Sequence, residues 1–465
     1  MSERAADRLP ASEPEVPRLH LDGEWPRGPS GVSYPISGGS GERWTHAGYR
    51  AEISGIGTGV EAVRTGFPLM ENIRGLVAPD SGELHGHQVV LGGESESAAR
   101  WATGLDLPVV LVDLPRGPSS SSWTVSLGSP RIKLSADGRA LQVRSGAGDT
   151  EALFVVSDGR LAAVHEAGGV VVRCMAPGPA RLLAAGARNR ADLARVLDLL
   201  DRRGVAGLLR QRSMHAEQLH RGGVGIAHSR AELSRLYEWA KIAADARVGS
   251  WLARRAEGRN SADAEPIAAL AAALLAAGLP AHARAWIRAG ESTAGSDDLV
   301  PALRRLRERF RLWAGGDPAV APAPEVPPLP EAGDVPVPAL ARVAAGEATD
   351  EELIAILILP HREWSIRPDA SRGEVALAPA LPPDGMLGAV SRLRIGRTVL
   401  DLRLRPRAGM VAFAVRRGAG PKIFVSCDLR RLSATEVLLD GEPIGGAAPR
   451  FEVEGEHELL IHPGA

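Results

Sequence analysis

The clearest pattern of apolar and polar positions lies in the stretch 229–252. Apolar side chains recur there every three or four residues, at Leu233, Leu236, Tyr237, Ala240, Ala244 and Val248. This spacing gives a helix one apolar face, so we expect an amphipathic helix. Ser229 and Glu232 have the spacing of a capping box, in which both side chains bind free amides at a helix start. Lys241 follows Glu238 by three residues, and we expect an exposed ion pair between them.

The chain before this helix has the pattern of an antiparallel sheet. From about Trp44 onward, short β-rich runs such as 108–114 are bounded by Gly, Pro and Ser. Residues 137–138 and 158–159 are both Asp-Gly, the dipeptide typical of two-residue hairpins, and a Gly-Gly turn follows at 168–169. Consecutive hairpins at this spacing predict an antiparallel sandwich or meander.

Helical spacing continues on both sides of the central helix. We expect further helices over 193–219, 267–275, 281–289, 299–313 and 351–359. Pro360 is expected to stop the last of them, because proline lacks the amide that a continuing helix needs. Alternating apolar residues return after 375, and Asp440-Gly441 is a further hairpin signal.

This order predicts an α+β multidomain protein. We expect an N-terminal antiparallel β-sandwich, a central incomplete layer of helical hairpins (α/α), and a C-terminal antiparallel β-sheet or sandwich. Residues 1–40 are rich in Pro, Gly, Ser and charge, which predicts a disordered leader. The sandwich, the helical region and the C-terminal domain are then assigned to 41–188, 189–359 and 360–465, with a proline-rich linker or extended loop at 318–338.

The composition is that of a globular protein, with 44% apolar and 24% charged residues. The formal net charge is -1, from 55 basic and 56 acidic residues, so no overall field recruits nucleic acid or an anionic membrane. The longest apolar stretches, such as 268–279, fall short of the roughly 20 residues of a membrane span. Cys174 and Cys427 lie far apart, which favours neither a disulfide framework nor a structural zinc. Since the N-terminus lacks the apolar core of a secretory signal, we expect a soluble cytoplasmic protein.

Two short motifs suggest ligand binding, and each has a plainer interpretation. The glycines of 55–59 (GIGTG) resemble a phosphate cradle but lack the third glycine of the dinucleotide fingerprint, so a turn is favoured. His85 and His87 flank a glycine, but no third ligand stands nearby in sequence, so a plain loop is favoured over a metal site. His215 and His220 fall on different helix faces and are expected to face solvent. We therefore expect no metal ion and no cofactor.

Aromatic and acidic side chains of the helical region are the candidates for binding and catalysis. Aromatic rings stack on sugar faces, although helical tryptophans more often belong to a core. The tryptophans are Trp239, Trp251, Trp286, Trp313 and Trp364. Glycoside hydrolysis needs two carboxylates roughly 5–10 Å apart. The acidic residues are Asp263, Glu265, Glu291, Asp297, Asp298 and Glu363, of which the first two also suit the cap and first turn of a helix opening near Pro266.

Four segments together resemble one family of proteins: 233–245 (LSRLYEWAKIAAD), 263–287, 364–381 and 437–460. They are similar, in this order, to the start of the catalytic barrel, the next inner helix, the exit from the barrel and the terminal hairpins of glycogen-debranching-type proteins. These are the amylo-α-1,6-glucosidase-like members of the six-hairpin glycosidases. The resemblance implies an oligosaccharide or α-glucan as ligand, with Asp263, Trp251 and Trp364 as substrate-binding candidates.

The chain departs from that family where the sugar would be held. The family has Gly-Arg-Asp before its first inner helix, whereas the matching residues here are Ser261, Ala262 and Asp263. A closed six-hairpin barrel has twelve helices, which need roughly 200 residues at least, and the stretch 232–359 is shorter. No acid–base pair can be assigned, and losing one of two cooperating carboxylates removes most of the rate. Asp263, Glu265 and Glu363 are the catalytic candidates that the sequence offers.

Three functions remain open, in order of preference. The first is a glycosidase-like protein that has lost catalysis and binds a carbohydrate or a protein partner. The second is an assembly protein whose half-barrels complete each other in an oligomer, because an open helical layer exposes apolar faces. The third is a residual glycosidase acting on α-linked glucans, with Asp263 or Glu265 working together with Glu363.

Overall fold

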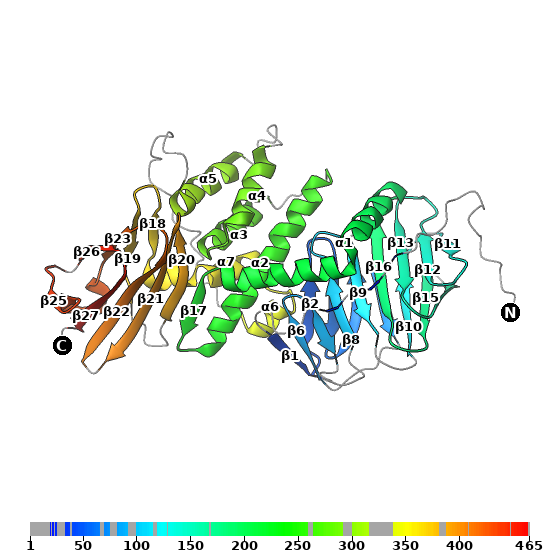
Figure 1. The fold of residues 1–465 in the computed structure, drawn as a ribbon, viewed down its shortest axis with the longest axis horizontal. Coiled ribbons are helices and arrows are strands. Elements are labelled where there is room, and N and C mark those ends of the chain that lie inside the picture. The colour runs from blue at the N-terminus through cyan, green and yellow to red at the C-terminus, as the bar shows by residue number, and fades with distance from the viewer. Residues whose placement is uncertain are drawn as a thin grey trace. The chain divides into compact units, whose positions relative to one another are not determined.

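The elements follow one another as sheet, helices and sheet, which confirms the predicted fold class (Figure 1). The computed structural model divides into two units, Met1–Glu217 with Ala344–Gly346, and Gln218–Val343 with Glu347–Ala465. The division into four domains predicted from the sequence remains a prediction. The residues that the structure describes are 19, 21–22, 24–25, 33–37, 40–65, 69–74, 81–91, 99–114, 119–127, 129–166, 169–258, 264–291, 300–315, 338–380, 387–407, 409–446 and 448–463.

The first unit contains two antiparallel sheets. The nine-stranded sheet runs, in spatial order, through β1 (Ser33–Ser37), β6 (Ser81–His85), β7 (Val89–Leu91), β8 (Ala99–Thr103), β9 (Val109–Asp113), β16 (Arg181–Ala187), β13 (Glu151–Val156), β12 (Ala140–Arg144) and β11 (Arg131–Leu134). The seven-stranded sheet runs through β14 (Arg160–Glu166), β15 (Gly169–Ala176), β10 (Ser119–Val125), β5 (Leu69–Arg74), β4 (Gly59–Arg64), β3 (Glu52–Ile56) and β2 (Arg43–Ala47). Trp101 of the first sheet stacks on Trp123 of the second, with ring centroids 5.6 Å apart, so the two sheets share a sandwich core.

Helix α1 (Arg190–Glu217) closes the other face of the nine-stranded sheet. Its apolar residues, among them Leu193 and Leu200, pack with Leu153 and Leu183 in one buried cluster. The helix is kinked at Gly204, whose φ of 64° lies in the left-handed region that glycine adopts without steric cost. The sequence predicted this helix from its apolar spacing but not the kink.

One predicted hairpin is wrong. Strands β13 and β14 flank the Asp158-Gly159 signal, yet β13 pairs with β12 and β16, while β14 pairs with β15 in the other sheet. Gly159 has φ 114°, and a Cβ there would lie 2.2 Å from the carbonyl oxygen of Met175. The chain therefore uses this glycine to cross between the sheets against β15, rather than to turn back on itself.

The predicted disordered leader, residues 1–40, is also wrong in part. Strand β1 lies within it and pairs with β6, because Tyr34 and Ile36 alternate with exposed residues and face the core. Leu21 and Trp25 are buried as well. Residues 1–18 lie outside the described part of the chain.

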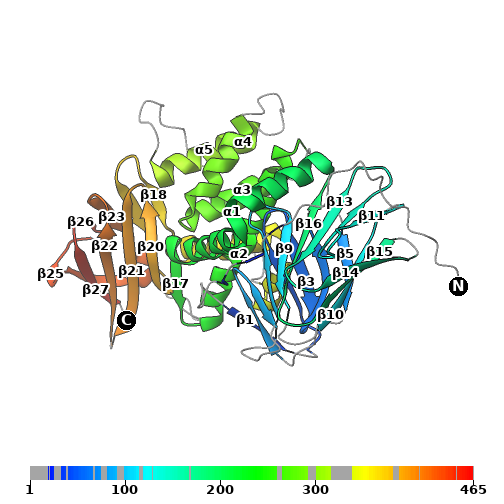
Figure 2. The same cartoon turned by 45° about the vertical axis from the view of Figure 1, so that its right-hand side comes forward.

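The second unit begins with η1 (Gln218–Gly222), a π-helical turn, and the short strand β17 (Gly225–His228). Its helices are α2 (Ala231–Ala256), α3 (Ala264–Ala276), α4 (Pro280–Glu291), α5 (Val300–Ala314), α6 (Leu340–Ala344), α7 (Asp350–Leu357) and α8 (Leu359–Trp364). Helix α3 lies at the centre of this layer and contacts α2, α4, α5 and α7 (Figure 2). It can do so because it consists almost entirely of alanine and leucine, most of them buried.

Two helix boundaries differ from the prediction. The residue at the N-cap of α2 is Arg230, with no side-chain cap, so the predicted capping box of Ser229 and Glu232 does not form. A complete capping box is found instead at α7, where the Thr349 and Glu352 side chains bind each other's backbone amides. Pro360 does not stop a helix but lies in the first turn of α8, where its missing amide has no helical partner to lose.

The C-terminal strands form two further sheets. The seven-stranded sheet runs through β17, β20 (Leu387–Ile395), β21 (Thr398–Arg407), β22 (Met410–Ala419), β27 (Glu456–Pro463), β24 (Ala434–Leu439) and β25 (Glu442–Pro443). The four-stranded sheet runs through β18 (Arg367–Asp369), β19 (Glu374–Leu377), β23 (Ile423–Cys427) and β26 (Arg450–Val453), and a short 3-10 helix, η3, spans Arg430–Leu432. All described pairs are antiparallel except β19 with β23. None of the helices in the described ranges has the length and apolarity that crossing a membrane requires.

Candidate functional site

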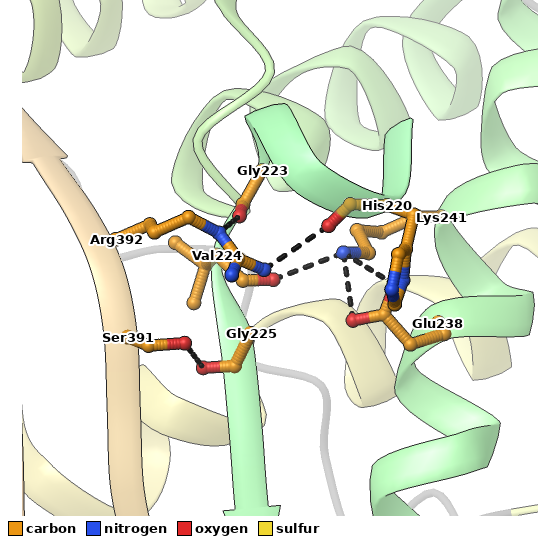
Figure 3. A network of polar contacts seen from close by, with 8 residues as sticks. All are labelled: His220, Gly223, Val224, Gly225, Glu238, Lys241, Ser391 and Arg392. Atoms are coloured by element: carbon orange, nitrogen blue, oxygen red, sulfur yellow. Dashed lines mark hydrogen bonds and ion pairs between the residues drawn. The ribbon is translucent and has the colours of Figure 1, made fainter. Parts of the chain in front are cut away.

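The most connected polar group in the second unit surrounds Lys241 on α2 (Figure 3). We call it the Lys241 network, and its members are His220, Gly223, Val224, Glu238, Lys241 and Arg392. The Gly222-Gly223 break ends the π-turn here and leaves backbone carbonyls without helical partners. Two cations from distant segments bind these carbonyls.

Lys241 is one of these cations, and its side chain is completely buried. Its Nζ donates to the carbonyl oxygen of Val224 at 3.0 Å and to Oε1 of Glu238 at 2.8 Å. Nζ also lies 5.6 Å from the ring centroid of Tyr237, within range of a cation–π contact. The prediction of an exposed Glu238–Lys241 pair is therefore wrong, because this side of α2 is covered by the π-turn.

Arg392 on β20 is the second cation. Its guanidinium donates to the carbonyl oxygens of Gly223 at 2.9 Å and His220 at 3.1 Å. Arg392 has a φ of 58°, which is uncommon for a residue with a side chain, and it lies where the pairing of β20 with β21 shifts register. The Oδ1 atom of Asp401 accepts the Arg392 amide at 2.9 Å and helps to hold this conformation.

His220 extends the network toward solvent. Its Nδ1 lies 2.9 Å from Oε2 of Glu238, so the carboxylate joins the half-exposed imidazole to the buried ammonium. Burial lowers the pKa of Lys241, while the neighbouring Glu238 opposes that shift. Burial also raises the pKa of Tyr237. His220 was expected to face solvent, and its side chain is 41% exposed, but the sequence did not predict its contact with Glu238.

This arrangement is suited to holding structure rather than to reacting with a ligand. An amine that acts as a nucleophile or base must reach its substrate, and the Lys241 side chain is 0% exposed. Its donors are directed at Val224, Glu238 and the Tyr237 ring. The network therefore fixes the π-turn to α2 and β20.

The two described residues among the predicted catalytic carboxylates, Glu265 and Glu363, each bind a different partner. Asp263 lies outside the described residues. Glu265 is 66% exposed and forms an ion pair with Arg305. Glu363 is largely buried, with Oε1 3.4 Å from Nε2 of His228 and Oε2 accepting the Leu387 amide at 3.1 Å. No hydrogen bond or ion pair joins Glu265 to Glu363 in the described part of the chain.

The predicted substrate-binding tryptophans lie in the core. Trp251 is 0% exposed and stacks on Trp286, with ring centroids 5.7 Å apart. Trp364 is also 0% exposed and meets Phe413 edge to face. The apolar neighbour is supplied by helix α4 for Trp251 and by strand β22 for Trp364, and the role of both rings in substrate binding remains a prediction.

A buried His–Asp pair lies between α2 and α4. His282 Nε2 bonds Asp245, and both side chains are almost fully buried. Burial lowers the pKa of His282, but the adjacent Asp245 carboxylate more than offsets this, so the net shift of the pKa is upward. The pair joins α2 to α4, and the apolar spacing of these two helices did not predict it.

The His85-Gly86-His87 motif contributes to a histidine cluster in the first unit. The two rings are 5.8 Å apart, and His85 and Arg212 both help to lower the pKa of His87, while His87 in turn helps to lower the pKa of His46. Burial is the main cause that lowers the pKa of His87 to about 3, and it also lowers the pKa of His46. Across the residues that are described, no three metal-liganding side chains are arranged to hold an ion. The GIGTG motif forms the turn between β3 and β4, as predicted.

No protein-family model matches the chain, and no curated protein matches it. Solved structures of carbohydrate-active enzymes do match. A protein described as a kojibiose phosphorylase from human microbiome aligns over 96% of this chain and 100% of its own, at 6% identity and a TM-score of 0.44.

Two other similar structures are a family GH92 alpha-mannosidase from Bacteroides thetaiotaomicron and a bacterial glucoamylase complexed with acarbose. The mannosidase covers 93% of this chain and 90% of its own, at 8% identity and a TM-score of 0.35. The glucoamylase covers 58% and 52%, at 7% identity and a TM-score of 0.32. At these TM-scores the matches carry no conclusion about the activity of this chain.

Proposed function

We propose that the chain is a glycoside-hydrolase-like protein that has lost catalysis and acts as a binding module for a carbohydrate or a protein. One observation carries the proposal: six described carboxylates of the helical layer form ion pairs with arginine or histidine. The pairs are Asp245 with His282, Glu265 with Arg305, Glu291 with Arg307, Asp350 with Arg247, Glu352 with Arg342, and Glu363 with His228.

The chemistry of glycoside hydrolysis explains why these pairs matter. One carboxyl group must protonate the leaving oxygen, while a second must attack the sugar or activate water, roughly 5–10 Å away. A carboxylate that bridges two helices through an arginine or histidine has its oxygen atoms directed at that partner. These six acidic groups therefore serve as ion-pair links between segments of the layer, and the sequence lacks the arginine of the Gly-Arg-Asp motif.

A turnover assay tests the loss of catalysis. The purified chain is incubated with α-1,4- and α-1,6-linked glucans, with and without inorganic phosphate, and released sugar and sugar phosphate are measured between pH 4.5 and 8. We expect no product above an enzyme-free blank. Product that disappears in Glu363→Gln, and persists in Glu265→Gln, would refute the proposal.

Isothermal titration distinguishes the two kinds of ligand. Heat on adding maltoheptaose or another α-glucan oligosaccharide supports a carbohydrate-binding module. If none of the oligosaccharides gives heat, the protein-binding version remains. Light scattering at high concentration then tests whether that partner is a second copy, with the helical layers completing each other.

A residual hydrolase is the second candidate, and the partial exposure of Glu363 favours it. Nδ1 of His228 accepts the Arg230 amide at 3.0 Å, so its Nε2 carries the proton that faces Glu363. The Glu363 side chain is 17% exposed, whereas the side chain of Asp245 is only 2% exposed. A second carboxylate about 5–10 Å from Glu363 would have to supply the other catalytic group.

A further inference from the structure

An exposed row of arginines crosses the open face of the C-terminal seven-stranded sheet. Arg403, Arg405 and Arg407 occupy alternate positions of β21 and are all exposed, whereas Leu402 and Leu404 on the opposite face are buried and Pro406, near the strand's end, is exposed. Alternation places the three guanidinium groups on one face, at intervals of about 6.8 Å along the strand. We call this row the arginine ladder.

The neighbouring strands carry small side chains beside the ladder. Arg403 is opposite Ala389 on β20 and Ala414 on β22, and Arg405 is opposite Ala412 on β22. These three strands lie side by side in the sheet (Figure 1). Because alanine does not reach as far as arginine, the guanidinium groups project beyond their neighbours.

Two acidic residues on this face are already engaged, while Glu456, opposite Arg416, is exposed. Glu458 accepts from Arg407 at 3.1 Å, and Asp401 accepts from Arg416 at 2.7 Å and from a backbone amide. Within the described ranges, Arg403 and Arg405 make no hydrogen bond or ion pair, although Asp401 lies near enough to Arg403 for electrostatic attraction. The ladder thus retains donors directed away from the protein.

We propose that the arginine ladder docks an extended acidic protein segment with a carboxylate at every second residue. Such a segment has the same repeat as β21, because alternate side chains of any β-strand share a face at about 6.8 Å. Successive carboxylates can therefore meet successive guanidinium groups, which bind carboxylates in a bidentate manner. The proposal goes beyond the proposed function, since it concerns the C-terminal sheet and not the helical layer.

The composition of the face argues against single-stranded nucleic acid as the ligand. Single-stranded nucleic acids are bound through aromatic side chains on which bases stack, whereas a sulfated glycan would need only the basic groups and is distinguished below by experiment. The residues paired with the ladder on the two adjacent strands are Ala389, Ala412, Ala414 and Met410. They offer small apolar surface between the charges, which suits a peptide whose other residues are small.

Fluorescence anisotropy with labelled peptides tests this inference. The probe is the decapeptide (Glu-Thr)5, in which every carboxylate can face one side of a strand. The control peptide, (Glu-Glu-Thr-Thr)2-Glu-Thr, has the same composition and charge but interrupts that pattern. We expect the probe to bind the full chain at low salt more tightly than the control does.

Variants connect binding to the ladder. The double variant Arg403→Gln/Arg405→Gln should lower the affinity for the probe by about tenfold or more. The matched variant Arg397→Gln/Arg431→Gln removes two exposed arginines elsewhere and should change binding by less than about twofold. Circular dichroism confirms that both variants are folded.

Four results would overturn the inference. They are no binding of the probe, equal binding of the two peptides, equal loss in the two double variants, and tighter binding of heparin or oligo-dT than of the probe. The last result would assign the face to a glycan or a nucleic acid. None of these results bears on turnover, so this inference and the loss of catalysis can fail separately.

Discussion

Replacing Glu238 by glutamine should destabilise the second unit far more than the same change in a surface ion pair. Glutamine has nearly the size of glutamate and keeps a neutral acceptor beside Nζ of Lys241. In the unaltered protein, Nζ lies 2.8 Å from Oε1 of Glu238. The change therefore removes a negative charge without removing volume. The Lys241 ammonium stays 0% exposed but loses the group that balances its charge.

The magnitude follows from burial. Removing one partner of a buried ion pair generally costs about 3–5 kcal/mol, because the remaining charge is buried away from water with no opposite charge beside it. Here the Val224 carbonyl still accepts a hydrogen bond from Nζ, so we expect about 2–4 kcal/mol. In a unit of roughly 250 residues, each kcal/mol lowers the melting midpoint by about 2–4 °C. The midpoint should fall by about 5–15 °C.

Differential scanning calorimetry measures this shift for the Glu238→Gln variant. Glu454→Gln is the matched control, because Glu454 forms a 2.5 Å pair with Lys422 in the same unit, yet both side chains are mostly exposed. The control should leave the midpoint unchanged. Adding Lys241→Met to Glu238→Gln removes the stranded charge, so the double variant should melt higher than Glu238→Gln alone.

The pH dependence supplies an independent check. Without Glu238, burial lowers the pKa of Lys241 further, so the folded state binds fewer protons than the unfolded state below the usual lysine pKa. Stability then rises with pH, and the deficit of Glu238→Gln should shrink as the pH approaches 10. The reasoning is refuted if Glu238→Gln melts like Glu454→Gln, or if Lys241→Met lowers the midpoint of Glu238→Gln further.

Three further predictions concern other parts of the chain. Gly55→Ala should destabilise the first unit by more than about 2 kcal/mol, because the added Cβ would lie 2.2 Å from the Gly59 carbonyl oxygen. In the control variant Gly59→Ala, the added Cβ meets only an ordinary contact at 3.4 Å, and chemical denaturation compares the free energies of unfolding of the two variants. Thr349→Ala should cost about 1–2 kcal/mol by removing the capping box of α7, and Thr349→Ser should restore most of it in the same assay. Burial lowers the pKa of His361 to about 4, so the unfolded state takes up the proton first and stability falls by roughly 3 kcal/mol between pH 6.5 and pH 4. His361→Phe keeps a ring against Trp313 and should flatten that acid limb in a pH series of melting curves, while an unchanged limb would exclude His361 as its cause.

Local periodicity predicted the fold class and most helices because it depends on neighbours within a few residues. The spacing of 281–289 predicted a helix that the structure places at Pro280–Glu291. Periodicity does not identify which strands pair. Strand β17 lies before the helical layer and joins β20 of the C-terminal sheet, and nothing within four residues of β17 indicates that partner.

The same limit explains the error at Glu238 and Lys241. Their spacing of three residues correctly predicts an ion pair on α2, but the depth of that pair depends on what covers the helix. The cover is the π-turn that precedes β17, and Arg392 on β20 binds that turn. One signal was available in the sequence: Lys241 lies four residues after Tyr237 and three before Ala244, within the apolar face itself.

The candidate catalytic residues show how this limit affects the prediction of function from sequence. Glu363 is a catalytic candidate because it lies at the predicted barrel exit. Its partner in the structure, His228, precedes α2 in the sequence. Sequence spacing cannot distinguish a carboxylate that reaches a substrate from one that joins two segments, since both need an acid at a helix end. The contact with His228 and the Leu387 amide makes the second role physically sufficient to explain Glu363. A catalytic role would therefore require turnover that Glu363→Gln removes without lowering the melting midpoint.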